Sequence, residues 1–293
     1  MITIFTPTYN RAYILPQLYN SLLRQSNTKF IWMVIDDGST DDTGVLIEKW
    51  KSERKIAIEY VRKENGGMHT AHNKAFDLVT TDCCVCIDSD DYLPDTGVAD
   101  MLEAWDEIKD EATLAGVIGL DANKEGEVIG SRFPDGLTRS TLNALQRKHK
   151  VTGDKKLVMR TLVVQEFDRY PEYSEERLVP LGTLYLKIDQ KYQWSIVNKV
   201  FCIVEYLQDG STRNILNQYR RNPKGFAYER QLRIALEPSI GRKFRNYIHL
   251  VSSAFFAGDL RLLTSAKYKY LMPLAFVPGL LFHWYVLGKT KRS

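Results

Sequence analysis

The chain of 293 residues lacks several features that would place it in a specialised class of protein. It has four cysteines, and three of them, Cys83, Cys84 and Cys86, stand together in an apolar run, which does not match the paired spacing of a zinc site. The net charge of +4 is too small to indicate a nucleic-acid partner. Internal repeats and low-complexity segments are missing as well. These absences leave an ordinary globular chain, with its cysteines expected as buried thiols in a reducing compartment.

The sequence also shows no secretory leader and no long uninterrupted apolar run. It begins with the apolar pattern of a strand, without the basic and apolar stretches of a signal peptide, which predicts a cytoplasmic protein. Residues 271 to 287 are apolar, but two prolines interrupt them and they fall short of the roughly 20 residues that a spanning helix needs. Flanking lysines and internal aromatic residues suit contact with the inner surface of a membrane. A helix packed on the protein explains the segment equally well, and a protein-docking segment is the third interpretation.

Short β-type runs alternate with helical patterns through the first 110 residues. Strands are expected at residues 2–6, 31–35, 56–61 and 83–87, and residues 12–25 repeat apolar side chains with a helical period. This alternation predicts an α/β fold with a mostly parallel central sheet flanked by helices. Beyond it we expect a strand at 114–120, an irregular acceptor-binding region at 121–165, a helical pattern from Arg177, strands within 192–206 and a mainly helical remainder.

Two carboxylate clusters each follow one of these strands. Residues 36 and 37 form an Asp pair after the second strand, and residues 88 to 91 read Asp-Ser-Asp-Asp after the fourth. Such positions, at the carboxyl ends of strands, are where open α/β sheets bind ligands. Carboxylates separated by one residue, as in Asp88 and Asp90, can hold a hard cation that keeps positions open for phosphate oxygens. The pattern predicts a metal diphosphate ligand, and a loop of solvated acids without a metal is the alternative.

Four blocks of sequence carry a family resemblance. They are Thr6-Pro7-Thr8-Tyr9-Asn10-Arg11, Asp36-Asp37-Gly38-Ser39-Thr40-Asp41, Asn65-Gly66-Gly67 with Ala71-His72-Asn73-Lys74-Ala75, and Asp88-Ser89-Asp90-Asp91. In order and spacing they resemble the family 2 inverting glycosyltransferases, strongly over residues 1–110 and loosely beyond. Residues 205–212 and Asn222-Pro223-Lys224-Gly225 resemble segments of a polysaccharide-assembly subset. The resemblance implies the GT-A fold, with a nucleotide-sugar half at 1–110, an acceptor half with the catalytic base at 111–215, and a helical C-terminal region at 216–293.

The resemblance also implies a donor site, with UDP as the expected nucleotide and others left open. The implied donor contacts are Thr6, Tyr9, Asp36, Gly67, Asn73, Lys74, Asp88, Ser89 and Asp90. Asp36 is expected to accept a hydrogen bond from the imide of a uracil-type base. Mn²⁺ or Mg²⁺ is expected on Asp90, with Asp88 and Asp91 as further ligands, although Asp91 has the alternative of orienting its neighbour. Asp37, Ser39 and Asp41 are expected to shape the turn and cap the next helix, and His72 stands where relatives commonly have Arg.

An inverting transfer also needs a carboxylate base for the acceptor hydroxyl. The pair Glu175 and Glu176 supplies one, and similarity to relatives that read Gly-Glu-Lys favours Glu176, with Glu175 as the alternative. Acids in the first turn of a helix are the structural explanation of the same pair.

The predicted function is metal-assisted transfer of a sugar from a nucleotide sugar to a hydroxyl of a surface-glycan or lipid-linked saccharide. The rivals are a nucleotidyltransferase that makes nucleotide sugars and a non-catalytic protein that binds them.

Overall fold

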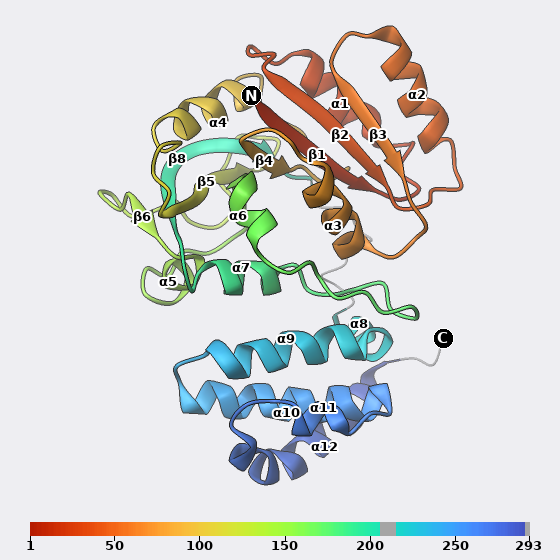
Figure 1. Ribbon diagram of the computed structural model, residues 1–293, viewed down its shortest axis with the longest axis vertical. Coiled ribbons are helices and arrows are strands. Elements are labelled where there is room, and N and C mark those ends of the chain that lie inside the picture. The colour runs from red at the N-terminus through yellow and green to blue at the C-terminus, as the bar shows by residue number, and fades with distance from the viewer. Residues whose placement is uncertain (206–214, 291–293) are drawn as a thin grey trace. The chain divides into compact units, whose positions relative to one another are not determined.

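The computed structural model describes residues 1–205 and 215–290, so most of the loosely matching segment at 205–212 lies outside the described residues. The chain divides into two compact units (Figure 1). Unit 1 comprises Met1–Asp168 and Lys187–Leu207, and unit 2 comprises Arg169–Leu186 and Gln208–Ser293. The segment that carries the acidic pair therefore groups with the C-terminal helices, whereas the sequence analysis assigns it to the acceptor half.

Within the described residues, unit 1 is built on an eight-stranded mixed sheet in the order β3-β2-β1-β4-β7-β5-β8-β6. The strands are β1 (Ile2–Thr8), β2 (Phe30–Asp36), β3 (Ile58–Arg62), β4 (Cys83–Cys86), β5 (Leu114–Ala122), β6 (Arg139–Ser140), β7 (Lys155–Arg160) and β8 (Gln193–Ile203). Strands β1 to β4 are parallel, as predicted, while β7 runs antiparallel to both β4 and β5.

Helices flank this sheet and bury its apolar side chains. They are α1 (Leu15–Leu23), α2 (Thr43–Glu53), α3 (Met68–Leu78), α4 (Gly97–Asp106), α5 (Leu142–Arg147) and α6 (Thr161–Glu166). Helix α1 presents Leu15, Leu18 and Leu22 to the core at the predicted period, and each is almost completely buried. Burial of one such side chain stabilises the fold by about 1.5–3 kcal/mol, which fixes the helices against the sheet.

The region from residue 121 to residue 165 is more regular than the sequence predicts. It contains β6, α5, β7 and most of α6. Strand β7 begins with two lysines, so it lacks the apolar pattern of a central strand, yet Lys156 is buried there beside Asp91. The helical pattern expected from Arg177 was also wrong at its start, because α7 (Gly182–Ile188) begins only after Pro180.

Unit 2 is helical in its C-terminal part, as predicted. Its helices are α8 (Ile215–Arg221), α9 (Pro223–Leu236), α10 (Ile240–Ala257), α11 (Arg261–Thr264), the 3₁₀ turn η2 (Lys269–Leu271) and α12 (Met272–Lys289). Helices α9, α10 and α12 share a core that includes Ile234, Tyr247, Leu250 and Ala275. A methyl group at Gly279 of α12 would lie only 2.4 Å from Cβ of Val251, so α10 and α12 pack closely through this glycine.

Candidate active site

The four motif blocks meet at one edge of the sheet in unit 1. Each block follows one of the parallel strands β1 to β4, and these strands are paired in register, with Thr8 opposite Asp36, Asp36 opposite Arg62, and Phe5 opposite Cys86. The carboxyl ends of parallel strands lie along the same edge, where open α/β sheets bind ligands. The fold therefore gathers at one edge the residues that the sequence places in four separate segments.

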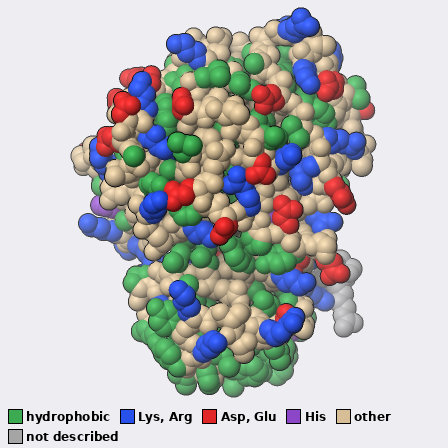
Figure 2. All heavy atoms as spheres, viewed as in Figure 1, with side chains coloured by type: hydrophobic (Ala, Val, Ile, Leu, Met, Phe, Trp, Pro, Cys, Tyr) green, Lys and Arg blue, Asp and Glu red, His purple; other side chains and the backbone are tan. Residues whose placement is uncertain are grey.

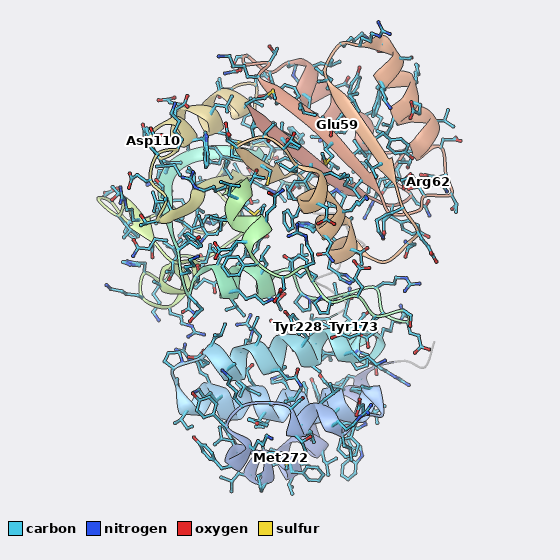
Figure 3. The ribbon with its side chains drawn as sticks, viewed as in Figure 1. Glu59, Arg62, Asp110, Tyr173, Tyr228 and Met272 are labelled. Atoms are coloured by element: carbon cyan, nitrogen blue, oxygen red, sulfur yellow. The ribbon has the colours of Figure 1, made fainter. Side chains whose placement is uncertain are left out.

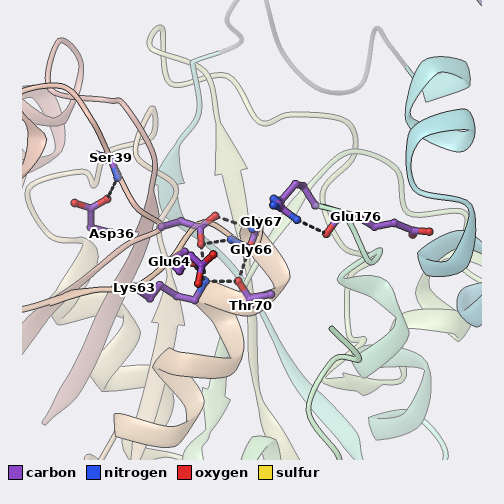
Figure 4. Close-up of polar contacts among 10 residues, drawn as sticks. Asp36, Ser39, Lys63, Glu64, Gly66, Gly67, Thr70 and Glu176 are labelled. Carbon is purple, nitrogen blue, oxygen red and sulfur yellow. Dashed lines mark hydrogen bonds and ion pairs between the residues drawn. The ribbon is translucent and has the colours of Figure 1, made fainter. Parts of the chain in front are cut away.

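Asp36 is fully buried at the end of β2. Its Oδ1 accepts a hydrogen bond from the backbone N–H of Ser39 at 2.8 Å, drawn in Figure 4, and its Oδ2 accepts one from the hydroxyl of Tyr60 at 2.6 Å. Arg62, labelled in Figure 3, supports the same loop by donating to the carbonyl of Ser39 at 2.8 Å. Asp36 thus shapes the loop, and the uracil contact predicted for it has to share or displace one of its two internal hydrogen bonds.

Asp37 joins the second motif block to the third. It accepts hydrogen bonds from the backbone N–H groups of Gly66 and Gly67 at 2.9 and 2.7 Å, and from Nζ of Lys63 at 2.7 Å (Figure 4). Lys63 also donates to the hydroxyl of Thr70 in the first turn of α3, and Gly67 has φ +94°, in the region that favours glycine. The sequence analysis gave Asp37 a role in its own turn and passed over Lys63, although a cation just beyond the end of β3 was a usable signal.

The first block contributes structure at Thr6 and Asn10 and exposed groups at Tyr9 and Arg11. Thr6 is fully buried and accepts a hydrogen bond from the indole N–H of Trp32 at 3.0 Å, so its side chain faces the core. Asn10 accepts a hydrogen bond from the backbone N–H of Thr40 at 2.7 Å and so ties the first block to the second. Tyr9 is exposed, and the guanidinium of Arg11 is near enough to favour ionisation of Asp90.

The third block places α3 beside the site. His72 is buried, and burial lowers its pKa to about 4, with Asp88 opposing that shift. It is therefore neutral near pH 7, so it supplies no positive charge where relatives commonly have Arg. On the same helix Asn73 is buried and Lys74 is half-buried.

The fourth block separates into carboxylates that face outward and one that faces inward. Asp88 and Asp90 are half-buried, whereas Asp91 is buried with its Oδ2 3.3 Å from Nζ of Lys156 and 3.7 Å from Sγ of Cys202. Burial raises the pKa of Asp91 to about 7 against the opposing effect of Lys156. This geometry favours the orienting role left open for Asp91 over a role as metal ligand.

The pair Asp88 and Asp90 fits a divalent cation. Burial, and then the negative charge of Asp88, raises the pKa of Asp90, so the two carboxylates are crowded and incompletely neutralised. Across the described ranges no cluster of three or more His, Cys, Asp or Glu side chains is arranged as a metal site. An ion held by one or two carboxylates takes its other ligands from water and substrate phosphates, as Mg²⁺ does in nucleotide enzymes.

The acidic pair of unit 2 is clamped to the start of α9. Glu176 is buried, and its two carboxylate oxygens accept hydrogen bonds from the backbone N–H groups of Lys224 and Gly225, both at 2.8 Å. Asn222 accepts a hydrogen bond from the backbone N–H of Arg177 at 2.9 Å, which fixes the same segment. Two loosely matching segments of the sequence are thus brought together, and Glu175 beside them is exposed.

The environment of Glu176 changes its acidity in a direction that suits a base. Burial raises the pKa of Glu176, although the two backbone donors oppose this shift. Tyr173 and Tyr228 of α9, labelled in Figure 3, lie nearby, and burial together with the charge of Glu176 raises the pKa of Tyr173. A carboxylate with a raised pKa accepts a proton more readily than an exposed one.

Comparison with known proteins defines the class. The family model described as glycosyl transferase family 2 matches residues 3–166, and the chain belongs to this family. Poly(ribitol-phosphate) beta-N-acetylglucosaminyltransferase TarS of Staphylococcus aureus is 28% identical over 170 residues, which is 57% of this chain and 29% of TarS. Chondroitin synthase of Escherichia coli is 29% identical over 136 residues, or 45% of this chain and 19% of that protein. The chain thus spans less than a third of the length of either relative.

Solved structures show the same GT-A fold. The structure of S. aureus TarS 1–349 in complex with UDP-GlcNAc matches with a TM-score of 0.61 at 18% identity, over 97% of this chain and 90% of that one. A mannosyltransferase of Pyrobaculum calidifontis in complex with GDP-Man and Mn²⁺ matches with a TM-score of 0.57 at 17% identity, over 97% and 87% of the two chains. The protein is therefore a glycosyltransferase with a GT-A fold and a helical C-terminal part.

Proposed function

We propose that the protein transfers a sugar from a UDP-sugar to a hydroxyl of a surface-glycan or lipid-linked saccharide, with inversion at the anomeric carbon and with a divalent metal ion. The observation that carries this proposal is the half-buried pair Asp88 and Asp90 at the sheet edge where the four motif blocks meet. The complex of the TarS portion with UDP-GlcNAc supports a uridine nucleotide, and the mannosyltransferase complex supports Mn²⁺.

The donor site proposed here lies along the carboxyl ends of β1 to β4. Tyr9, Gly67, Asn73, Lys74 and Ser89 remain the proposed contacts of the nucleotide sugar. Thr6 and Asp36 support the walls of this site from the core, and Asp37 holds the backbone turn that precedes α3. We add Arg11, whose positive charge acts on Asp90, as a cation that approaches the diphosphate.

In the proposed reaction a carboxylate of unit 2 removes the proton from the acceptor hydroxyl while that oxygen attacks the anomeric carbon. The bond between this carbon and the diphosphate breaks on the opposite face, so UDP leaves and the configuration inverts. Mn²⁺ or Mg²⁺ held by Asp88 and Asp90 neutralises charge on the departing diphosphate. Glu176 is the proposed base because its pKa is raised and two backbone donors fix its orientation, and exposed Glu175 is the alternative.

We place the proposed reaction on the cytoplasmic side of the membrane, where a lipid-linked acceptor is within reach. Release of UDP from a panel of UDP-sugars, measured with Mn²⁺ and saccharide acceptors and repeated with a chelator, tests the proposal. Metal-dependent release that rises with an acceptor is the expected result. Turnover of only GDP-, dTDP- or CMP-sugars would overturn the uridine assignment, and binding of a donor without any turnover would support the non-catalytic rival.

A further inference from the structure

Helix α12 points its small residues inward and its large apolar residues outward. Ala275, Gly279 and Val286 are buried, and Gly279 makes the close approach to Val251 of α10. The outward side chains form a stripe with helical spacing, and they are 53–68% exposed: Leu274, Val277, Leu281, Trp284 and Tyr285. A helix at a water-facing surface normally has the opposite arrangement, with its large apolar residues against the core.

Other exposed apolar residues extend this stripe within unit 2. Tyr268 and Tyr270 stand just before α12, and Leu260 stands between α10 and α11. Figure 2 shows the hydrophobic side chains gathered along the lower edge of unit 2. Monomeric soluble proteins rarely expose a large contiguous apolar patch, and such a patch commonly marks a contact with a membrane or another protein.

Positive charge is concentrated in the same part of the chain. Residues 240–293 contain nine Lys and Arg residues but one acidic residue, Asp259, which is paired with Arg261. The whole chain has a net charge of only +4, so residues 1–239 are net negative. Exposed Lys267 and Lys269 precede α12, and exposed Lys289 ends it. Apolar and aromatic side chains flanked by cations match the interface of a membrane with anionic lipids.

We propose that α12 docks unit 2 on an anionic lipid surface, with the helix lying in the plane of the membrane and its outward stripe among the acyl chains. The cationic residues at its two ends then lie at the level of the lipid phosphates. This docking rests on the proposed function in one respect, because it brings the enzyme to a lipid-linked acceptor. The surface itself follows from the residues of α12 and their charges alone.

Two other occupants of this surface predict different behaviour. Lys269–Lys289 is long and apolar enough to cross a membrane by length and composition, and its 21 residues exceed the apolar run read from the sequence. Because α12 packs along α10, crossing would carry Arg242 and Arg245 of α10 toward the hydrocarbon. A symmetric contact between two copies would bring the same cations together, which is unfavourable.

Tryptophan fluorescence gives a direct test, because Trp284 is 63% exposed while Trp32, Trp50, Trp105 and Trp194 are at most 6% exposed. Vesicles of phosphatidylcholine with one quarter phosphatidylglycerol, carrying brominated acyl chains, should quench Trp284 alone. Quenching should weaken at high salt and with pure phosphatidylcholine. Absence of quenching with retained UDP binding overturns the docking and leaves the proposed function intact, whereas quenching without UDP binding separates the two in the other direction.

Depth measurements distinguish docking in the plane from a span. In a Trp284→Phe background, Val277→Trp should be quenched by shallow bromines as strongly as native Trp284, since both positions lie on one stripe. Much deeper quenching of the Val277→Trp variant contradicts docking in the plane and indicates a span. Dimers that form without lipid and are lost in Leu281→Asp, with no flotation of either protein on vesicles, would instead identify a second copy as the occupant.

A matched pair of variants tests the surface without disturbing the core. Leu281→Asp places a charge at a position that is 58% exposed on α12, and Val45→Asp places the same charge at a position that is 73% exposed on α2. Flotation with anionic vesicles should fall at least tenfold for the first variant and remain unchanged for the second. Equal flotation of Leu281→Asp and the native protein overturns the proposal.

Discussion

Nζ of Lys156 lies 3.3 Å from Oδ2 of Asp91, and both side chains are buried. Lys156 belongs to β7 and Asp91 to the loop after β4, so this ion pair fixes the loop that carries Asp88 and Asp90 against the neighbouring strand. A buried pair of this kind stabilises the fold little compared with apolar side chains, but removal of one partner leaves a buried charge without compensation.

Lys156→Met should lower the free energy of unfolding by about 3–5 kcal/mol, because Asp91 is left buried and unpaired. Adding Asp91→Asn should restore a large part of the loss, since the uncompensated charge is then removed. Urea denaturation of the two single variants and the double variant measures this coupling. Additive losses would show that the two side chains do not interact in the folded protein.

The acidic pair of unit 2 is separated by conservative substitutions at each residue. Glu176→Asp withdraws the carboxylate by one methylene, and we expect kcat to fall about 10²–10⁴-fold, the size of a general-base contribution, while UDP affinity stays the same. Glu175→Gln should have a much smaller effect because its side chain is exposed. The opposite ranking, with kcat lost in Glu175→Gln and kept in Glu176→Asp, would identify Glu175 as the base and Glu176 as a structural residue that holds α9.

The contact between α9 and the acidic segment depends on the absence of a side chain at Gly225. A methyl group there would lie 2.1 Å from the carbonyl oxygen of Leu178, which is backbone and cannot rotate away. Gly225→Ala should therefore destabilise the protein by about 1–3 kcal/mol, as overpacking does. Gly288→Ala near the end of α12 is the matched control because nothing lies near its added methyl group, so its stability should be unchanged or higher. Thermal unfolding of both variants gives the comparison, and equal melting temperatures would contradict the close packing.

His249 of α10 makes stability depend on pH. Burial first, and then Arg230 and Arg245, lower the pKa of His249 to about 4, below its ordinary value of about 6.5. As the pH falls below 6.5 the unfolded chain takes up a proton that the folded protein refuses, so stability is lost between about pH 6.5 and 4. Allowing for partial exposure, we expect about 1 kcal/mol less stability from this residue at pH 5.5 than at pH 7.5.

The variant His249→Gln removes this titration and serves as the reference. The difference in unfolding free energy between native protein and variant, measured in urea at both pH values, should shrink or reverse in the acid sample. A difference that does not change with pH would mean that His249 titrates in the folded protein as it does in the unfolded chain.

The sequence predicted the parallel half of the sheet well, because β1, β2 and β4 are apolar runs bounded by turn residues. It did not predict β7, since a strand that begins with two lysines looks polar until Asp91 is known to lie against Lys156. The site followed the same division. The motif blocks were placed at the right strand ends, but the internal hydrogen bonds of Asp36 and Asp37 depend on Tyr60 and Gly66, which no local pattern connects to them.

The C-terminal segment shows a second limit of prediction from sequence. Its apolar composition was evident, yet only the packing of Gly279 on Val251 decides which face of α12 is buried and which is left outward. Composition therefore identified a segment that contacts either the protein or a membrane, and the structure shows that its small residues make the first contact.

The central claim is that Asp88 and Asp90 bind a uridine diphosphate group through a divalent metal. Calorimetric titration of UDP into the native protein, with and without Mn²⁺, tests it most directly when repeated with Asp90→Asn and with Asp95→Asn, whose carboxylate is exposed beside Arg24. The account predicts binding that requires Mn²⁺ in the native protein, is retained in Asp95→Asn and is lost at least a hundredfold in Asp90→Asn. Equal UDP affinity in all three proteins, or affinity that Mn²⁺ does not change, would contradict it.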